Sequence, residues 1–315
     1  YYDIKSNPTA YSSSGFYFNW LIENKINYNT VINEDHSINA VLVQSAQKET
    51  YKGDNVTATD FPNDYIQTIS GGTVIKGASD KTQWSIASYL VRVQYSYKGK
   101  YMASGAIRAD GSSRFGKNNR WGYFPSASLA WRVSGEDFFT KAKFLSFVDD
   151  LKIRTSYGVT GNFQIGNYDH LSLMALDNYI LGTGNGQLVQ GYKPNTIKND
   201  DLSWEKNAMV NVGVDLQMFK GLLGITVDYY NTNTSNMLLN VPVPHLTGYS
   251  TALMNIGKVN NRGWEIALTS QKNFTKDFGY SFNANYATNT NEVKALGPGN
   301  APIISTGSVD HAYYL

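Results

Sequence analysis

The chain has 315 residues, enough for one large domain or two ordinary ones, and a net charge of +2 that creates no strong field toward nucleic acid or acidic lipid. It contains no cysteine, which excludes a disulfide framework and a thiolate metal site. Charged residues make up 17% of the chain, below the roughly 25% of soluble domains. The sequence shows no apolar run long enough for a membrane helix and no signal-peptide pattern at its start. Because it begins as if inside a loop, we expect a piece of a longer chain.

Apolar and polar residues alternate in segment after segment, which is the period of a β-strand with two different faces. Within residues 88–98, Val91 and Val93 share one face, whereas Arg92 and Gln94 share the other. The alternation predicts about ten antiparallel strands of roughly 9–13 residues each. In chain order they lie near residues 19–29, 37–48, 88–98, 101–110, 124–134, 151–159, 209–218, 223–231, 263–271 and 278–291.

The connections between these strands alternate in predicted length. Short connections are expected at 30–36, 98–100, 219–222 and 274–277, and long ones at 49–83, 111–123, 160–207 and 232–262. Only 134–150 breaks the order, because it is a long connection where a short one is expected. Tight turns at one end and long loops at the other are typical of an up-and-down outer-membrane barrel.

The alternation alone does not say which face meets water. A soluble sandwich turns its apolar face toward a core, whereas a membrane barrel turns it toward lipid and keeps the polar face inside. The loop asymmetry and the length of the strands favour the barrel, because a tilted membrane strand needs about 9–11 residues and globular strands average about 5–6. Aromatic residues near strand ends, such as Tyr95, Tyr97 and Tyr101, suit an interfacial girdle.

Residues 134–149 are predicted to form a short helix at the rim of the sheet. Ser134 and Asp137 have the spacing of a capping box, and Phe138, Ala142 and Leu145 fall on one helical stripe. The stripe is only two to three turns long, so we favour a small plug at a turn over a membrane-surface anchor.

The segment "GSSRFGKN" at 111–118 nearly matches a phosphate-binding loop, G-x-x-x-x-G-K-[S/T]. Asn118 occupies the position of the hydroxyl residue that would hold magnesium, and a strand follows instead of a helix. We therefore interpret the segment as a loop with an Asp110–Gly111 turn signal and cationic residues at a barrel mouth.

No catalytic or metal-binding constellation is expected. The adjacent acid pairs at 136–137, 149–150 and 200–201 point apart and do not supply the geometry of a glycosidase. The four histidines are scattered without metal-ligand spacing, and no G-x-S-x-G elbow occurs. We therefore predict that the chain is not an enzyme and needs no cofactor.

Charged residues on the polar faces of the strands have two interpretations. They bind substrate, or they pair with neighbours and stiffen the inner wall, and the second is the commoner case. These residues are Arg92, Arg108, Asp110, Arg132, Lys152, Arg154 and Asp215. Loop aromatics also leave two alternatives open, stacking on a sugar or peptide and packing of the loops against one another. The candidate substrate-binding residues are Asp110, Arg114, Arg120, Trp121 and Trp204.

Several segments resemble one family, the SusC/RagA-like TonB-dependent receptors of Bacteroidetes outer membranes. The most specific segment is "RADGSSRFGKNNRWGYFPSASLAWRVSGEDFF" at 108–139, and "LKIRTSYGVTGNFQIGNY" at 151–168 is a second. Three more are "LSWEKNAMVNVGVDLQMF" at 202–219, "VDYYNTNTSNMLLNVPVPHLTGYS" at 227–250 and "NIGKVNNRGWEIAL" at 255–268. Together they span most of residues 84–296, and residues 1–83 match more loosely.

The resemblance implies a 22-stranded transmembrane barrel with an N-terminal plug, a TonB-contacting segment and a SusD-like surface lipoprotein as lid. We expect residues 1–315 to be a partial, all-β barrel domain without the plug domain and the TonB box. The expected function is active import of a bulky nutrient through the outer membrane, with oligosaccharide the favoured cargo and peptide the alternative. The remaining expected partners are the TonB complex and outer-membrane lipid, and nucleic acid is not one. A passive porin and a soluble all-β binding module are the alternative functions.

Overall fold

The computed structural model describes residues 8–63, 65–66, 68–182, 186–296, 304–305 and 313–314. The chain divides into two compact units. Unit 1 comprises Tyr1–Glu23 and Ser45–Ala87, and unit 2 comprises Asn24–Gln44 and Ser88–Leu315.

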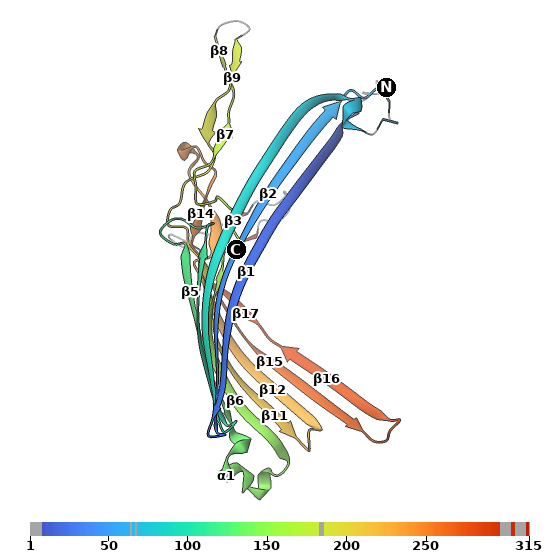
Figure 1. Ribbon diagram of the computed structural model, residues 1–315, viewed down its shortest axis with the longest axis vertical. Coiled ribbons are helices and arrows are strands. Elements are labelled where there is room, and N and C mark those ends of the chain that lie inside the picture. The colour runs from blue at the N-terminus through green and yellow to red at the C-terminus, as the bar shows by residue number, and fades with distance from the viewer. Residues whose placement is uncertain are drawn as a thin grey trace. The chain divides into compact units, whose positions relative to one another are not determined.

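One large sheet follows the order of the chain (Figure 1), as the alternation predicts for an up-and-down meander. In the order in which they pair, its strands are β1 (Ala10–Ile32), β2 (His36–Thr59), β3 (Thr73–Tyr97), β4 (Tyr101–Ser112), β5 (Trp121–Arg132), β6 (Val148–Asn162), β11 (Glu205–Met218), β12 (Leu223–Ser235), β15 (Lys258–Asn273) and β16 (Gly279–Ala287). The predicted antiparallel all-β fold of about ten strands is confirmed. The sheet does not close on itself among the described residues, in agreement with a partial barrel.

The predicted strand at 278–291 is divided into β16 and β17 (Thr290–Ala295), and both pair with β15. The backbone N–H of Thr288 donates to the Trp264 carbonyl at the break, 2.8 Å away. The side chain of Tyr230 crosses β15 at Gly263, where a Cβ would lie 2.7 Å from the Tyr230 hydroxyl. This glycine therefore gives the tyrosine room to pass.

Within unit 1, the prediction of a long loop at 49–83 is wrong. β2 continues to Thr59 and β3 begins at Thr73, with a 3-10 turn, η1 (Ile69–Gly71), between them. Polar side chains bond across these strands: Glu49 accepts from Trp84 Nε1 at 3.1 Å and from Asn19 Nδ2 at 3.4 Å. Because polar residues occupy both faces here, the period of two is hidden in the sequence.

The predicted helix at 134–149 is confirmed only as helical turns, and its extent and cap are wrong. Two 3-10 turns, η2 (Val133–Gly135) and η3 (Lys143–Leu145), flank an α-helical turn, α1 (Asp137–Thr140). The Ser134 hydroxyl donates to Asp150 on β6 instead of capping, and α1 has no side-chain cap. A tertiary hydrogen bond therefore replaces the local one that the capping-box spacing predicts.

Unit 2 has a short-turn end and a loop end. Connections 33–35, 98–100, 133–147, 219–222 and 274–278 lie at the short-turn end, where Figure 1 also shows α1. The connections 113–120, 163–204 and 236–257 lie at the loop end. They carry the small hairpins β7 (Met174–Leu176) with β10 (Tyr192–Pro194), β8 (Tyr179–Leu181) with β9 (Gln187–Val189), and β13 (Leu238–Pro242) with β14 (Thr251–Asn255), and the 3-10 turn η4 (His245–Thr247). A further short pair is β18 (Ile304–Ser305) with β19 (Tyr313–Tyr314).

The sheet of unit 2 has one apolar face and one polar face. Across the strands, Val214 lies between Ile153 and Val227, and the neighbouring row places Gly213 between Arg154 and Asp228. Apolar side chains on their face stay open: Val212 is 45% exposed, Trp264 51% and Leu129 60%. An apolar face left uncovered by a second sheet is expected of a membrane barrel and not of a soluble sandwich.

Candidate functional site

The centre of the polar face is organised by one guanidinium group. Arg154 Nη2 donates to Asp228 Oδ2 at 2.6 Å, and Arg154 Nε donates to Asp215 Oδ2 at 3.2 Å. The guanidinium crosses β11 at Gly213, where a Cβ would lie 2.6 Å from its Cζ. Lys152 Nζ adds a second cation to Asp215 at 2.9 Å. These charges neutralise one another across three strands. They therefore fit the interpretation that charges on the polar face pair with their neighbours and stiffen the wall.

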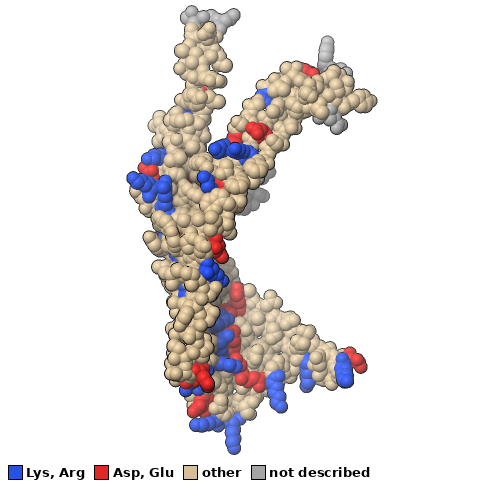
Figure 2. Space-filling view, viewed as in Figure 1, with Lys and Arg blue, Asp and Glu red and all other residues tan. Residues whose placement is uncertain are grey.

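Two further ion pairs repeat this arrangement on the same face. Arg108 Nε reaches both oxygens of Asp110, at 2.8 and 2.7 Å, and its Nη2 donates to Ser88 Oγ at 3.1 Å. Arg132 Nε donates to Asp150 Oδ1 at 2.8 Å. Figure 2 shows basic and acidic side chains interleaved, with no large area of one sign in view. In these pairs each cation faces a carboxylate, so the pairs themselves add little net charge to this face.

A loop core, formed by Phe115, Phe124, Phe163, Leu202 and Trp204, lies at the loop end. Trp204 is the central ring, with centroids 4.9 Å from Phe115, 5.3 Å from Phe124 and 5.6 Å from Phe163. Phe115 and Leu202 are fully buried and Trp204 is 3% exposed. The core therefore joins the 113–120 connection to β5 and to both ends of the 163–204 connection.

Glycines allow this close approach. A Cβ at Gly116 would overlap the backbone carbonyl oxygen of Asp200. At Gly122 a Cβ would lie 3.0 Å from Trp204 Cγ, and at Gly161 it would overlap the ring of Phe124. The "FGKN" and "RWGYF" stretches thus serve backbone packing, in place of the phosphate binding that the near-match to a nucleotide loop suggests.

Three of the five predicted site residues, Arg114, Arg120 and Trp204, come together at this core. Trp204 Nε1 donates to the Arg120 carbonyl at 3.0 Å, so Arg120 contributes its backbone. Arg114 Nε donates to Asn167 Oδ1 at 2.9 Å, and its guanidinium lies 5.3 Å from the Phe163 ring.

The other two predicted residues lie apart from the loop core. Asp110 is 6% exposed and bound to Arg108 on the polar face. Trp121 stacks with Tyr89 at 6.1 Å on the apolar face. A direct role of these five residues in binding cargo stays a prediction.

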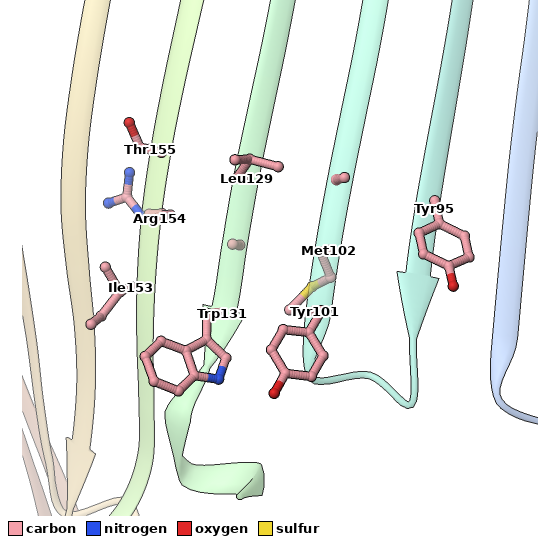
Figure 3. A pocket seen from close by; sticks show the side chains of 10 residues that line it. Tyr95, Tyr101, Met102, Leu129, Trp131, Ile153, Arg154 and Thr155 are labelled. Carbon is pink, nitrogen blue, oxygen red and sulfur yellow. The ribbon is translucent and has the colours of Figure 1, made fainter.

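An apolar groove of about 470 Å³ lies on the apolar face near the short-turn end. Figure 3 shows Trp131 and Tyr101 beside each other at its lower edge, with Tyr95 higher on the right, Leu129 above and Ile153 on the left. Aromatic rings beside aliphatic side chains at a strand end are typical of the interfacial girdle of a membrane barrel. This groove therefore suits acyl chains and not a polar cargo.

One carboxylate links the girdle to the short-turn end. Glu136 accepts from Trp131 Nε1 at 3.1 Å and from Lys100 Nζ at 3.3 Å. Hydrogen bonds from the Tyr101 hydroxyl, Trp131 and Lys100 hold the pKa of the Glu136 carboxyl below its usual value. The ionised form is therefore the one that the fold favours.

Sequence reasoning missed a polar pocket of about 250 Å³ at the loop end. It lies between the 163–204 connection and the β13–β14 hairpin, and none of the five predicted residues lines it. Its residues come from polar loop stretches whose composition differs little from other loops, so a single sequence holds no signal for it.

Across the residues that the structure describes, no group of three or more His, Asp or Glu side chains could hold a metal ion. Among the helices described, none combines the length and apolar character that crossing a membrane requires.

Comparison with known proteins identifies the family. The family model "TonB dependent receptor-like, beta-barrel" matches residues 1–307. TonB-dependent receptor P39 of Formosa agariphila is 37% identical over 283 residues, which cover 89% of this chain and 26% of the relative. TonB-dependent receptor SusC of Bacteroides thetaiotaomicron is 33% identical over 236 residues, covering 74% of this chain and 22% of the relative.

Among solved structures, that of the RagAB peptide transporter matches with a TM-score of 0.82 and 26% identity, covering 93% of this chain and 32% of that chain. The chain spans about a quarter of the length of the curated relatives it matches. It lies in the outer membrane, where SusC/RagA-type receptors reside. The chain belongs to the TonB-dependent receptor-like β-barrel family.

Proposed function

We propose that this chain forms part of the barrel wall of a SusC-like transporter that imports a bulky nutrient, an oligosaccharide, across the outer membrane. In this proposal residues 1–315 are a partial barrel domain, and the plug domain and TonB box lie elsewhere in the receptor. A SusD-like surface lipoprotein delivers cargo at the loop end, and the TonB complex supplies energy from the inner membrane. No catalytic step is involved.

The two-faced sheet of unit 2 is the observation that carries the proposal. One face is apolar and open, whereas the other holds its charges in ion pairs such as Arg154–Asp228 at 2.6 Å. Pairing of these charges limits the field that a charged cargo would meet along this face, which favours a neutral cargo. The described sheet has open edges, which supports a part of a larger barrel over a self-contained porin.

Peptide import is the second candidate, and a specific observation supports it. The structure that matches with a TM-score of 0.82 is that of the RagAB peptide transporter. The loop-end chemistry argues for the oligosaccharide, because the polar pocket there is lined by amide, hydroxyl and carboxylate groups, including Asn240, Thr251 and Asp169.

Uptake in cells that produce the complete receptor tests the proposal. Fluorescent neutral oligosaccharides and fluorescent peptides are supplied separately, with and without a functional TonB. We expect oligosaccharide uptake that is lost without TonB. Uptake that survives the loss of TonB would identify a passive porin, and TonB-dependent uptake of peptides alone would favour the second candidate.

A further inference from the structure

The polar pocket at the loop end combines side chains from two connections that are distant in the sequence. Asp169 and Asn195 come from the 163–204 connection, and Asn240, Tyr249 and Thr251 come from the 236–257 connection. Its volume of about 250 Å³ is a little below the roughly 300–1,000 Å³ of pockets that enclose a drug-sized ligand. It therefore suits one ring of a longer ligand.

Hydrogen bonds hold together the two connections that line the pocket. Asn199 Nδ2 donates to the Leu253 carbonyl at 3.0 Å. Asn255 accepts from the Ser203 N–H at 2.7 Å and donates to the Ser203 carbonyl at 2.7 Å. With its walls fixed in this way, the pocket orders few groups when a ligand enters, which lowers the entropic cost of binding.

The wall on the side of the 163–204 connection is also fixed. Thr196 Oγ1 accepts from the Leu173 N–H at 2.8 Å and donates to the Leu171 carbonyl at 2.9 Å. The Thr196 hydroxyl thus closes the neck of the β7–β10 hairpin next to the pocket. Its bonds are already used, so it supports the wall and leaves ligand binding to its neighbours.

The lining keeps several polar groups available. The side chains of Asn195, Asn240, Tyr249 and Thr251 make no hydrogen bond with the described residues. Asp169 accepts from the Gly166 N–H at 2.6 Å through one oxygen, which leaves the other oxygen for a ligand. The pocket thus offers amide donors and acceptors, hydroxyl groups and a carboxylate oxygen in one small volume.

This inventory matches a neutral sugar better than an anionic sugar or a peptide. Amide and carboxylate groups bond to sugar hydroxyls, and the Tyr249 ring with Ile197 and Leu253 offers apolar surface to the C–H face of a ring. The lining contains no Lys, Arg or His, so nothing balances the charge of a uronate or of a peptide carboxylate beside Asp169.

We infer that the pocket between 163–204 and 236–257 binds one neutral sugar ring of an oligosaccharide cargo. The inference rests on the proposed import function, and it assigns that cargo a contact site on the receptor itself.

The test is calorimetric binding to the purified complete receptor in detergent. The probes are neutral gluco-, manno-, xylo- and galacto-oligosaccharides, uronate oligosaccharides and mixed peptides. The variant Asn240→Ala/Thr251→Val removes two free polar groups from opposite strands of the β13–β14 hairpin. Asp177→Asn is the matched control, since Asp177 lies in the same connection as Asp169 but pairs with Lys193 at 3.3 Å, outside the pocket.

We expect the parent receptor to bind a neutral oligosaccharide, the double variant to bind it about tenfold more weakly or worse, and the control to stay within about twofold. Unchanged melting temperatures show that the variants fold. Equal affinity of parent and double variant, or parent binding of only uronate oligosaccharides, only peptides or none of the probes, would overturn the inference. The import proposal is judged separately, since it fails if uptake does not need TonB, whatever the pocket binds.

Discussion

The two ends of the unit 2 sheet are held in different ways. At the short-turn end the backbone itself reverses the chain: Lys98 and Gly99 have φ angles of 52° and 64°, and the Lys100 N–H donates to the Tyr97 carbonyl at 2.9 Å. This is a type I′ hairpin turn, whose twist matches the flanking strands. At the loop end, by contrast, the connections are held by the buried side chains of the loop core.

The difference shows where the fold depends on local sequence and where it depends on distant contacts. Phe115 and Trp204 are neighbours in space although all of β5 and β6 and most of the 163–204 connection separate them in the chain. A change in a turn is therefore felt locally, whereas a change in the loop core loosens several connections at once. The loop end is also where the polar pocket lies, so its rigidity bears on the proposed sugar site.

The largest expected effect is that of Trp204→Ala. Removing a ring that is 3% exposed and contacts three other aromatic rings leaves a cavity, which costs about 3–5 kcal/mol of local stability. Hydrogen exchange in the complete receptor should rise in 113–120 and 199–204 and stay unchanged in 98–100.

Trp264→Ala is the matched control, because Trp264 is 51% exposed on the apolar face and contacts Tyr229 at 5.0 Å. It should leave exchange in both loop segments as in the parent. Equal loosening by the two tryptophan variants would show that the loop core is not what holds the loop end.

Two glycine variants sharpen the same contrast. Gly116→Ala forces a Cβ into the Asp200 carbonyl, so backbone must shift, at a cost of about 1–3 kcal/mol. Gly99→Ala meets open space and costs about 1–2 kcal/mol from its positive φ alone.

Limited proteolysis distinguishes the two variants. Gly116→Ala should make 113–120 and 199–204 cleavable, whereas Gly99→Ala should leave the cleavage pattern unchanged and lower only the unfolding temperature. Cleavage at the loop end in Gly99→Ala would mean that the two ends are coupled more tightly than their contacts indicate.

The strands and tight turns of unit 2 follow from the sequence because alternation and turn residues are local signals. The same alternation, extended back from Leu129 and Trp131, puts Trp121 on the apolar face, so its stack with Tyr89 was open to prediction. The burial of Trp204 could not be predicted in this way, because its partners come from connections without periodicity. The cap predicted for the 134–149 helix is absent for a related reason, since the Ser134 hydroxyl bonds to Asp150 on β6.

The smallest expected effect is a pH dependence at the short-turn end, where the Glu136 carboxylate links Trp131 of the girdle to Lys100. Its pKa is lowered from 4.5, first by the Tyr101 hydroxyl and then by Trp131. A carboxyl whose pKa is depressed in the folded state stabilises the fold above its ordinary pKa, and loses that contribution as the pH falls through the lowered value. The parent should therefore exceed Glu136→Gln in stability at neutral pH, and the gap should close in acid.

Thermal unfolding of both proteins between about pH 7 and pH 3 measures this gap. Asp137→Asn is the control, because Asp137 is 84% exposed and its Lys141 partner is 4.0 Å away. It should show no pH-dependent gap, since an exposed pair contributes little at any pH. A gap for Glu136→Gln that persists unchanged in acid would assign the contribution of Glu136 to packing, and the short-turn end would then resemble the loop end more than its turns suggest.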